Sequence, residues 1–128
     1  MKIYILSPVR NVTPEQQNII DNHVSRLELD SHDVYVPRYD VDQEDPTGFD
    51  ICSSHFCNML KADRVDIFWD ISSSGSHFDL GMAFACGKIV KLISAFSDDV
   101  EGKSYIKVIK EMESLQSSSK YYKNFISF

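Results

Sequence analysis

The sequence predicts an α/β fold: a single domain with a doubly wound, mainly parallel sheet of four to five strands and helices on both faces. Three observations favour this class. Short runs rich in β-branched and aromatic residues alternate with segments of helical periodicity along the chain. The segments between successive strands are long enough to cross the sheet as helices, which makes neighbouring strands parallel. The chain of 128 residues also has the length of one domain, so we expect residues 1–128 to fold as one flavodoxin-like or Rossmann-like unit.

The first half of the chain begins with a strand and a well-marked helix. The run KIYIL is apolar and ends at a Ser-Pro pair, as a buried strand does. Thr13, Pro14 and Gln16 have the order of a capping box with proline at the first helical position. The run DVYVP then has the composition of a strand, and an acidic loop follows it. We expect strands over residues 2–6 and 33–37, helices over 14–29 and 49–61, and a loop over 38–47.

The second half of the chain repeats this alternation. The run RVDIFW predicts a strand, and the loop ISSSGS leads from it into the apolar segment FDLGMAFACG. Gly87 suits the position just after a helix, where the backbone is left-handed. We expect strands over residues 64–69 and 89–93 and helices over about 77–86 and over 105–115. The aromatic tail YYKNFISF favours a last strand.

Charge and hydropathy exclude several classes of protein. With 13 Lys and Arg against 19 Asp and Glu, the net charge of −6 does not suit a protein that binds a nucleic acid polymer. No apolar run is long enough for a membrane span, and the amino terminus lacks the apolar core of a signal peptide. Cys52, Cys57 and Cys86 are odd in number and match no zinc spacing, which favours reduced thiols in the cytoplasm and no metal site.

Doubly wound sheets bind ligands at the carboxyl ends of their strands, near the point where the strand order reverses. This rule selects the loop over residues 7–12, which contains Ser7 and Arg10, and the loop that begins at Asp70. The guanidinium of Arg10 suits a phosphate, although a lone arginine after a strand is also an ordinary surface residue. Asp70 is compatible with two roles, contact with a base or ribose and capping of its own loop.

Asp79 is the only charged residue in the segment FDLGMAFACG. A helix that is apolar all round is buried, so we expect this carboxylate where removal from water matters. In one interpretation Ser76 caps the helix and Asp79 completes a capping box at the positive end of the helix dipole. In the other, the carboxylate faces the crevice and acts as a nucleophile or stabilises a cationic sugar, as in glycosidic cleavage. Gly81, two residues on, would allow a backbone or a ligand to come close.

Three further features have both a structural and a functional interpretation. The hydroxyl-rich segment 72–76 either caps a helix or binds a phosphate at the helix N-terminus, and it lacks the pattern of a P-loop. His55 lies in an expected helix, where a lone histidine is often structural or solvated. Tyr4 lies in the first expected strand, where a buried aromatic residue normally belongs to the core.

Three stretches of the chain resemble the nucleoside 2-deoxyribosyltransferase-like family, which includes the 2′-deoxynucleoside 5′-monophosphate N-glycosidases. They are KIYILSPVR, LKADRVDIFWD and SSGSHFDLGMAFACGKIVKLI, and they follow the family's order over roughly residues 2–93. The third is the most specific, because the family pattern there is S-G-T-x-x-E-L-G-x-A. The resemblance implies cleavage of the N-glycosidic bond between a base and a (deoxy)ribose, by water or by transfer to a second base. It also implies a homodimer or a larger homo-oligomer.

The resemblance further implies roles for individual residues. Asp79 stands at the position of the family's nucleophilic Glu, and Tyr4 matches a Tyr that orients the nucleophile in some members. Arg10 matches the arginine that binds the nucleotide phosphate. Two positions depart from the family pattern. Asp79 is one methylene shorter than Glu, and His55 stands where nucleotide-cleaving relatives carry an Asp, a place from which it would protonate the leaving base.

We therefore expect an enzyme, a nucleoside deoxyribosyltransferase or nucleotide N-glycosidase, that acts on a small nucleoside or nucleotide without a cofactor. The alternative is a catalytically weakened module of the same fold that binds and senses a nucleotide. The expected catalytic residues are Asp79, His55 and Tyr4. The expected substrate-binding residues are Ser7, Arg10, Asp70, Ser74, Gly75 and Ser76, of which Ser74 and Gly75 match the family loop that contacts phosphate or sugar.

Overall fold

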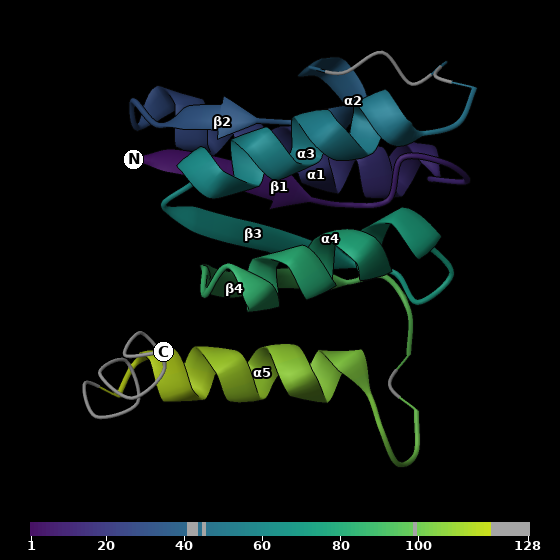
Figure 1. Cartoon of the computed structure of the whole chain (residues 1–128), viewed down its shortest axis with the longest axis vertical. Coiled ribbons are helices and arrows are strands. Elements are labelled where there is room, and N and C mark those ends of the chain that lie inside the picture. Colours follow the sequence, from purple (N-terminus) through teal and green to yellow (C-terminus); the bar gives the residue numbers. More distant parts are fainter. Residues whose placement is uncertain (41–43, 45, 99, 119–128) are drawn as a thin grey trace.

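Four parallel strands form the centre of the computed structural model, which describes residues 1–40, 44, 46–98 and 100–118 (Figure 1). The strands are β1 (Lys2–Leu6), β2 (Asp33–Tyr35), β3 (Arg64–Trp69) and β4 (Ile89–Ala95). The helices are α1 (Pro14–Leu29), α2 (Pro37–Asp40), α3 (Phe49–Lys61), α4 (Ser74–Ala85) and α5 (Tyr105–Gln116). The elements alternate along the chain as the sequence predicts.

The strands lie in the order β2-β1-β3-β4, and all three pairings are parallel. Helices α3, α4 and α5 pack on one face of this sheet and α1 packs on the other. The predicted doubly wound α/β fold is therefore confirmed. The strand order reverses between β1 and β3, so the loops that follow these two strands meet at the carboxyl edge where such sheets bind ligands.

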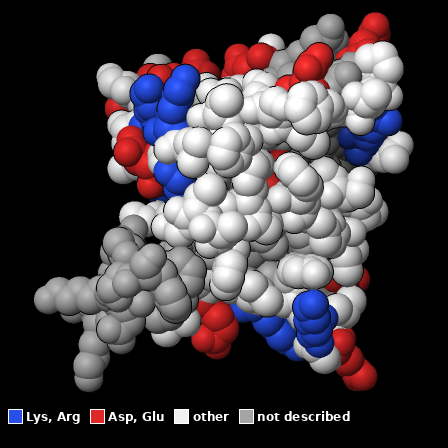
Figure 2. All heavy atoms as spheres, viewed as in Figure 1, with Lys and Arg blue, Asp and Glu red and all other residues white. Residues whose placement is uncertain are grey.

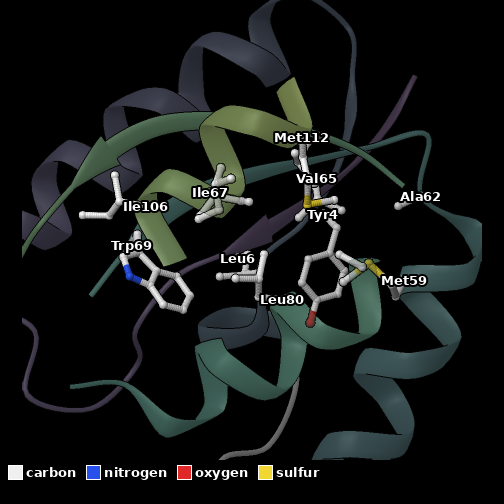
Figure 3. Close-up of a cluster of buried hydrophobic side chains, with 13 residues drawn as sticks. Tyr4, Leu6, Met59, Ala62, Val65, Ile67, Trp69, Leu80, Ile106 and Met112 are labelled. Atoms are coloured by element: carbon white, nitrogen blue, oxygen red, sulfur yellow. The ribbon is translucent and has the colours of Figure 1, made fainter. Parts of the chain in front are cut away.

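Each face of the sheet has its own apolar core because side chains alternate along the central strands. Tyr4 and Leu6 of β1 point toward α3, α4 and α5, whereas Ile3 and Ile5 point toward α1. Figure 3 shows the larger of the two cores. Its buried residues are Tyr4, Leu6, Met59, Ala62, Val65, Ile67, Trp69, Leu80, Ala83, Val90, Ile106, Ile109 and Met112.

Two predicted boundaries are wrong because capping contacts compete with apolar periodicity. The second strand ends at Tyr35 instead of residue 37, since the short helix α2 starts at Pro37 and Asp40 accepts a hydrogen bond from the Val36 amide. Helix α4 begins at Ser74 instead of about residue 77, because the Ser73 side chain accepts a hydrogen bond from the Ser76 amide and caps it.

Two further expectations are wrong: β4 continues to Ala95 instead of ending at residue 93, and residues 38–40, predicted as loop, belong to α2. Two predicted helix ends agree with the structure. Thr13 and Gln16 form both hydrogen bonds of the predicted capping box. Gly87 has a φ of 64°, and its amide and the next one bond back to the carbonyls of Phe84 and Ala83, which closes the end of α4. The last strand expected in the tail YYKNFISF lies outside the described residues, as does part of the acidic loop over residues 38–47.

Helix α4 is not buried all round, so this expectation is wrong. Leu80 and Ala83 face the sheet, but Phe78 and Phe84 are 55% and 45% exposed. No described residue approaches Gly81 closely, since a Cβ added there would meet no atom within 4 Å. The side of the molecule where α3 and α4 lie in front is mostly free of charged side chains through its centre (Figure 2).

Among the described residues, no helix combines the length and the apolar character that crossing a membrane requires.

Candidate active site

A buried carboxylate joins three elements of the fold. The Tyr4 hydroxyl donates a hydrogen bond of 2.7 Å to Asp79 Oδ2, and His55 Nδ1 lies 3.0 Å from Asp79 Oδ1. Tyr4 comes from β1, His55 from α3 and Asp79 from α4. Asp79 is only 4% exposed, so these two donors replace the water that an ionised carboxylate would otherwise bind.

The local sequence explains why Asp79 is free to make these contacts. Because Ser73 caps α4, Ser76 is the third residue of the helix and Asp79 lies in its second turn. The prediction of a capping box between Ser76 and Asp79 is therefore wrong. The carboxylate points inward beside Leu80, and it finds its partners on the neighbouring strand and helix instead of on its own first turn.

Tyr4 is held in its protonated form. Burial is the largest cause that raises the pKa of its hydroxyl far above the usual range, and the negative charge of Asp79 raises it further. The Tyr4 ring lies within the apolar core, and its hydroxyl oxygen lies on the side where α4 passes (Figure 3). Tyr4 is thus a core residue and a hydrogen-bond donor at once, which combines the two interpretations that the sequence left open.

One ring nitrogen of His55 contacts the carboxylate of Asp79, and the other has no hydrogen-bond partner among the described residues. The residue is 8% exposed, and its Nε2 atom is buried with no hydrogen-bond partner among the described residues. The rings of Tyr4 and Tyr35 pack edge-on against the imidazole, with centroids 6.0 and 6.2 Å away. Because Nδ1 already contacts Asp79, Nε2 is the ring atom whose hydrogen-bonding capacity is unused.

Asp79 and His55 line a pocket of about 390 Å³ at the carboxyl edge of the sheet, a volume in the range of small-molecule sites. The loop after β1 and the N-terminal parts of α3 and α4 supply most of its wall. The lining residues are Ser7, Val9, Arg10, Asn11, Pro37, Gly48, Ile51, Cys52, His55, Ser72, Ser73, Ser74, Gly75, Ser76 and Asp79.

One part of this pocket suits an anion. Arg10 is the only lysine or arginine among the lining residues that the structure describes. Ser74 and Gly75 are the first two residues of α4, whose N–H groups have no partner within the helix and carry the positive end of its dipole. A Cβ added at Gly75 would meet no atom within 4 Å, so the space beside this amide is open. The arrangement can hold a phosphate between a guanidinium and a helix N-terminus.

The sequence-predicted residues do not all reach the pocket. Asp70 is absent from the lining and instead accepts hydrogen bonds of 2.9 and 2.8 Å from the amide and hydroxyl of Ser72, which closes the turn after β3. Tyr4 is not a lining residue either, but its hydroxyl contacts Asp79, which is one. Ser7, Arg10, His55, Ser74, Gly75, Ser76 and Asp79 all line the pocket.

Sequence reasoning missed other parts of the wall, notably Asn11 and Cys52. Asn11 has a positive φ of 58°, a conformation that asparagine adopts more readily than most residues, so its place after a strand was a usable signal. Nothing in the sequence singles out Cys52 as a pocket residue. Among the described residues, no three His, Cys, Asp or Glu side chains are grouped as a metal ion would require.

The chain has the fold of two solved enzymes. The CMP N-glycosidase BcmB of Clostridium botulinum is 18% identical, with a TM-score of 0.58 over 88% of this chain and 82% of that one. A 2-deoxyribosyltransferase from the psychrotolerant bacterium Bacillus psychrosaccharolyticus is 22% identical, with a TM-score of 0.59 over 84% of this chain and 96% of that one. These neighbours confirm the fold that the sequence resemblance implies. No protein-family model and no curated protein matches the chain.

The contact between Tyr4 and Asp79 makes stability depend on pH. Replacing Tyr4 by Phe removes a buried hydrogen bond to a charged group, and we expect it to lower the free energy of unfolding by about 2 kcal/mol at pH 7. The raised pKa in the folded state means that only the unfolded wild type ionises Tyr4 above its ordinary pKa of 10.0. The difference in free energy of unfolding between the wild type and Tyr4→Phe is therefore constant below that pH. Above it, the difference falls by about 1.4 kcal/mol per pH unit. Urea titrations of both proteins between pH 7 and 11 measure this difference, and a constant difference over the range contradicts the prediction.

Proposed function

We propose that the chain cleaves the N-glycosidic bond of a (deoxy)nucleoside or a (deoxy)nucleoside 5′-monophosphate and passes the sugar to water or to a second base. In this proposal residues 1–128 act as one nucleoside deoxyribosyltransferase-like domain. The observation that carries it is a buried carboxylate, oriented by Tyr4 and His55, in the same pocket as Arg10 and the first amides of α4. Carboxylates react with sugars at the anomeric carbon, and a guanidinium beside a helix N-terminus binds phosphates. Together these features fit a substrate that carries a sugar and a phosphate.

In the proposed reaction Asp79 is the nucleophile. One of its oxygens forms a bond to C1′ of the sugar as the bond from C1′ to the base nitrogen breaks. The electron pair of that bond leaves with the base, which takes a proton from Nε2 of doubly protonated His55. The sugar is then bound to Asp79 as an ester. In the second step Nε2 takes a proton from water, the hydroxide oxygen bonds to C1′, and Asp79 is released as a carboxylate.

The two hydrogen bonds to Asp79 fit this cycle. The Tyr4 hydroxyl and the Nδ1 proton of His55 fix the plane of the carboxylate, and each carboxylate oxygen keeps a lone pair for attack. Both donors reach the shorter side chain of Asp, at 2.7 and 3.0 Å, which supports Asp79 as the working carboxylate of this proposal.

The central test is base release from deoxynucleoside monophosphates, followed by chromatography. We expect the wild type to release free base and Asp79→Asn to lower kcat by roughly a thousandfold or more, because the substitution removes the nucleophile. Asp79→Glu should also lose activity, since the added methylene displaces the carboxylate from Tyr4 or His55. Asp30→Asn, an exposed change at the end of α1, is the matched control and should retain activity.

Other outcomes of this test separate the alternatives. Nucleotide binding without any base release contradicts the enzyme proposal and favours the binding and sensing module. Base release that persists in Asp79→Asn contradicts the nucleophilic role of Asp79. A gain in rate with Asp79→Glu indicates a site that once held Glu and has lost activity.

Arg10 provides a separate test of phosphate recognition. We expect Arg10→Gln to raise KM for a 5′-monophosphate roughly tenfold to a hundredfold, because it removes a charge-assisted contact. Cleavage of the matching nucleoside, which has no phosphate, should change less than about twofold. Arg26→Gln, an exposed change on α1, serves as the control for lost positive charge. An equal effect on nucleotide and nucleoside contradicts the proposed role.

We also propose that the chain forms a homodimer through the exposed face of α3 and α4. This face carries large apolar side chains with exposed fractions of 72% for Phe49, 47% for Phe56, 52% for Leu60, 55% for Phe78 and 45% for Phe84. Exposed apolar patches of this kind are typical of association sites. Two chains of net charge −6 repel each other. The electrostatic repulsion between them is weakest where they meet through the uncharged centre of this face (Figure 2). The N-terminal halves of the same two helices line the pocket, so a partner there would lie near its rim.

Light scattering tests the dimer. The double change Phe56→Ser with Phe84→Ser should convert a dimeric protein into a monomer at micromolar concentration, because both residues lose their apolar surface. Leu29→Ser is the matched control, since Leu29 is 83% exposed on α1 at the other side of the sheet. A wild type that is monomeric, or a double variant that keeps the wild-type mass, contradicts the proposed interface.

A further inference from the structure

The outer edge of β4 is covered by side chains of α5. Within the described part of the chain β4 is the last strand of the sheet, with β3 on one side and no strand on the other. The backbone amide of Val90 donates a hydrogen bond of 2.9 Å to Gln116 Oε1, and Gln116 Nε2 donates one of 2.7 Å to the carbonyl of Lys88. The amide of Leu92 donates to Glu113 Oε1.

The Gln116 side chain imitates a strand. In a parallel sheet one residue donates its N–H to the residue before its partner and accepts from the residue after it. The amide group of Gln116 does both around Ile89, with the Lys88 carbonyl on one side and the Val90 amide on the other. Its own backbone is meanwhile part of α5. A single side chain thus occupies one full pairing unit of the β4 edge.

The position of α5 follows from its apolar stripe. Ile109 and Met112 are buried in the larger core, and residues three to four positions apart share one side of a helix. Glu113 and Gln116 follow on this side and therefore face the neighbouring strand. Exposed residues such as Glu111 and Ser114 lie on the solvent side of the same helix.

The two edges of the sheet differ in how much they need covering. Strand β2 has three residues, and short edge strands pair poorly with other chains. Strand β4 has seven, and its sequence IVKLISA is rich in the β-branched and apolar residues that favour pairing. Its one charged side chain is Lys91. Of the two edges of the described sheet, an uncovered β4 would be better suited than β2 to pairing with a second copy.

We propose that Glu113 and Gln116 act as a substitute for a fifth strand and keep the β4 edges of two copies from pairing. The partner that they exclude is a second copy of this chain, added strand to strand. Association is thereby confined to surfaces other than the sheet edge. This proposal does not depend on the proposed enzymatic function, because the edge lies outside the pocket and involves none of its residues.

The test is the double variant Glu113→Leu with Gln116→Leu, which keeps the side-chain volume and removes both polar groups. By light scattering, we expect its mass to exceed that of the wild type and to rise with concentration. At low concentration, the amides of Val90 and Leu92 should exchange with solvent roughly fivefold faster, the factor that corresponds to one net hydrogen bond. At high concentration their exchange should slow again, because strand pairing protects the same amides.

Two controls separate edge pairing from added apolar surface. Glu111→Leu with Ser114→Leu adds the same two side chains on the exposed side of α5 and should keep the wild-type mass. Glu113→Gln retains a side-chain oxygen that can accept the hydrogen bond from the Leu92 amide. This variant should also keep the wild-type mass. The amides of Ile5 and Ile67 in the central strands report whether each variant is folded.

A folded double variant with the wild-type mass overturns the proposal, whatever its exchange rates. Association without renewed protection of Val90 and Leu92 also overturns it, since the contact then lies elsewhere. If Ile5 and Ile67 lose protection in the double variant, the single change Gln116→Ala carries the same expectations for mass and exchange, and its failure to associate counts against the proposal in the same way.

Discussion

The constraint on which the site depends is that a carboxylate removed from water needs donors. Asp79 is almost fully buried, and an ionised carboxylate in such a place is tolerated only with well-placed hydrogen bonds. The hydroxyl of Tyr4 and the ring of His55 meet this need from two other elements of the fold. The orientation of the carboxylate therefore depends on how β1, α3 and α4 pack together. A shift of any of these three elements would leave a buried charge without a hydrogen-bond partner.

The element order was predictable because the signals that define it are local. The capping box at Thr13 and the glycine at position 87 each act within a few residues, and the structure has both. The start of α4 was not predictable in this way. Several serines in SSSGS can cap a helix, so the local sequence does not decide among them; in the structure Ser73 is the cap, and Leu80 and Ala83 face the sheet. This shift of register also frees Asp79 from a capping role.

The partners of Asp79 could not be found from local patterns. Tyr4 precedes it by 75 residues and His55 by 24, so no spacing rule connects them. The family resemblance suggested both residues, but it did not indicate that Nε2 of His55 would be left without a partner. Both crevice loops that the rule for parallel sheets selected contribute residues to the pocket. It did not distinguish Arg10, which lines the pocket, from Asp70, which closes its own turn.

Helix α4 sets the distance between two parts of the pocket, because both lie along the same helix. In the proposed function its first amides bind the phosphate, and Asp79 follows Ser74 by five residues, which is about 7.5 Å along the axis of an ideal helix. A helix is stiff, so the separation between the proposed phosphate position and the carboxylate would be fixed before a ligand binds. Such a site favours molecules whose reactive carbon lies at one distance from their phosphate. Specificity for a phosphorylated sugar would then follow from the register of one helix, which is set in turn by the choice of Ser73 as its cap.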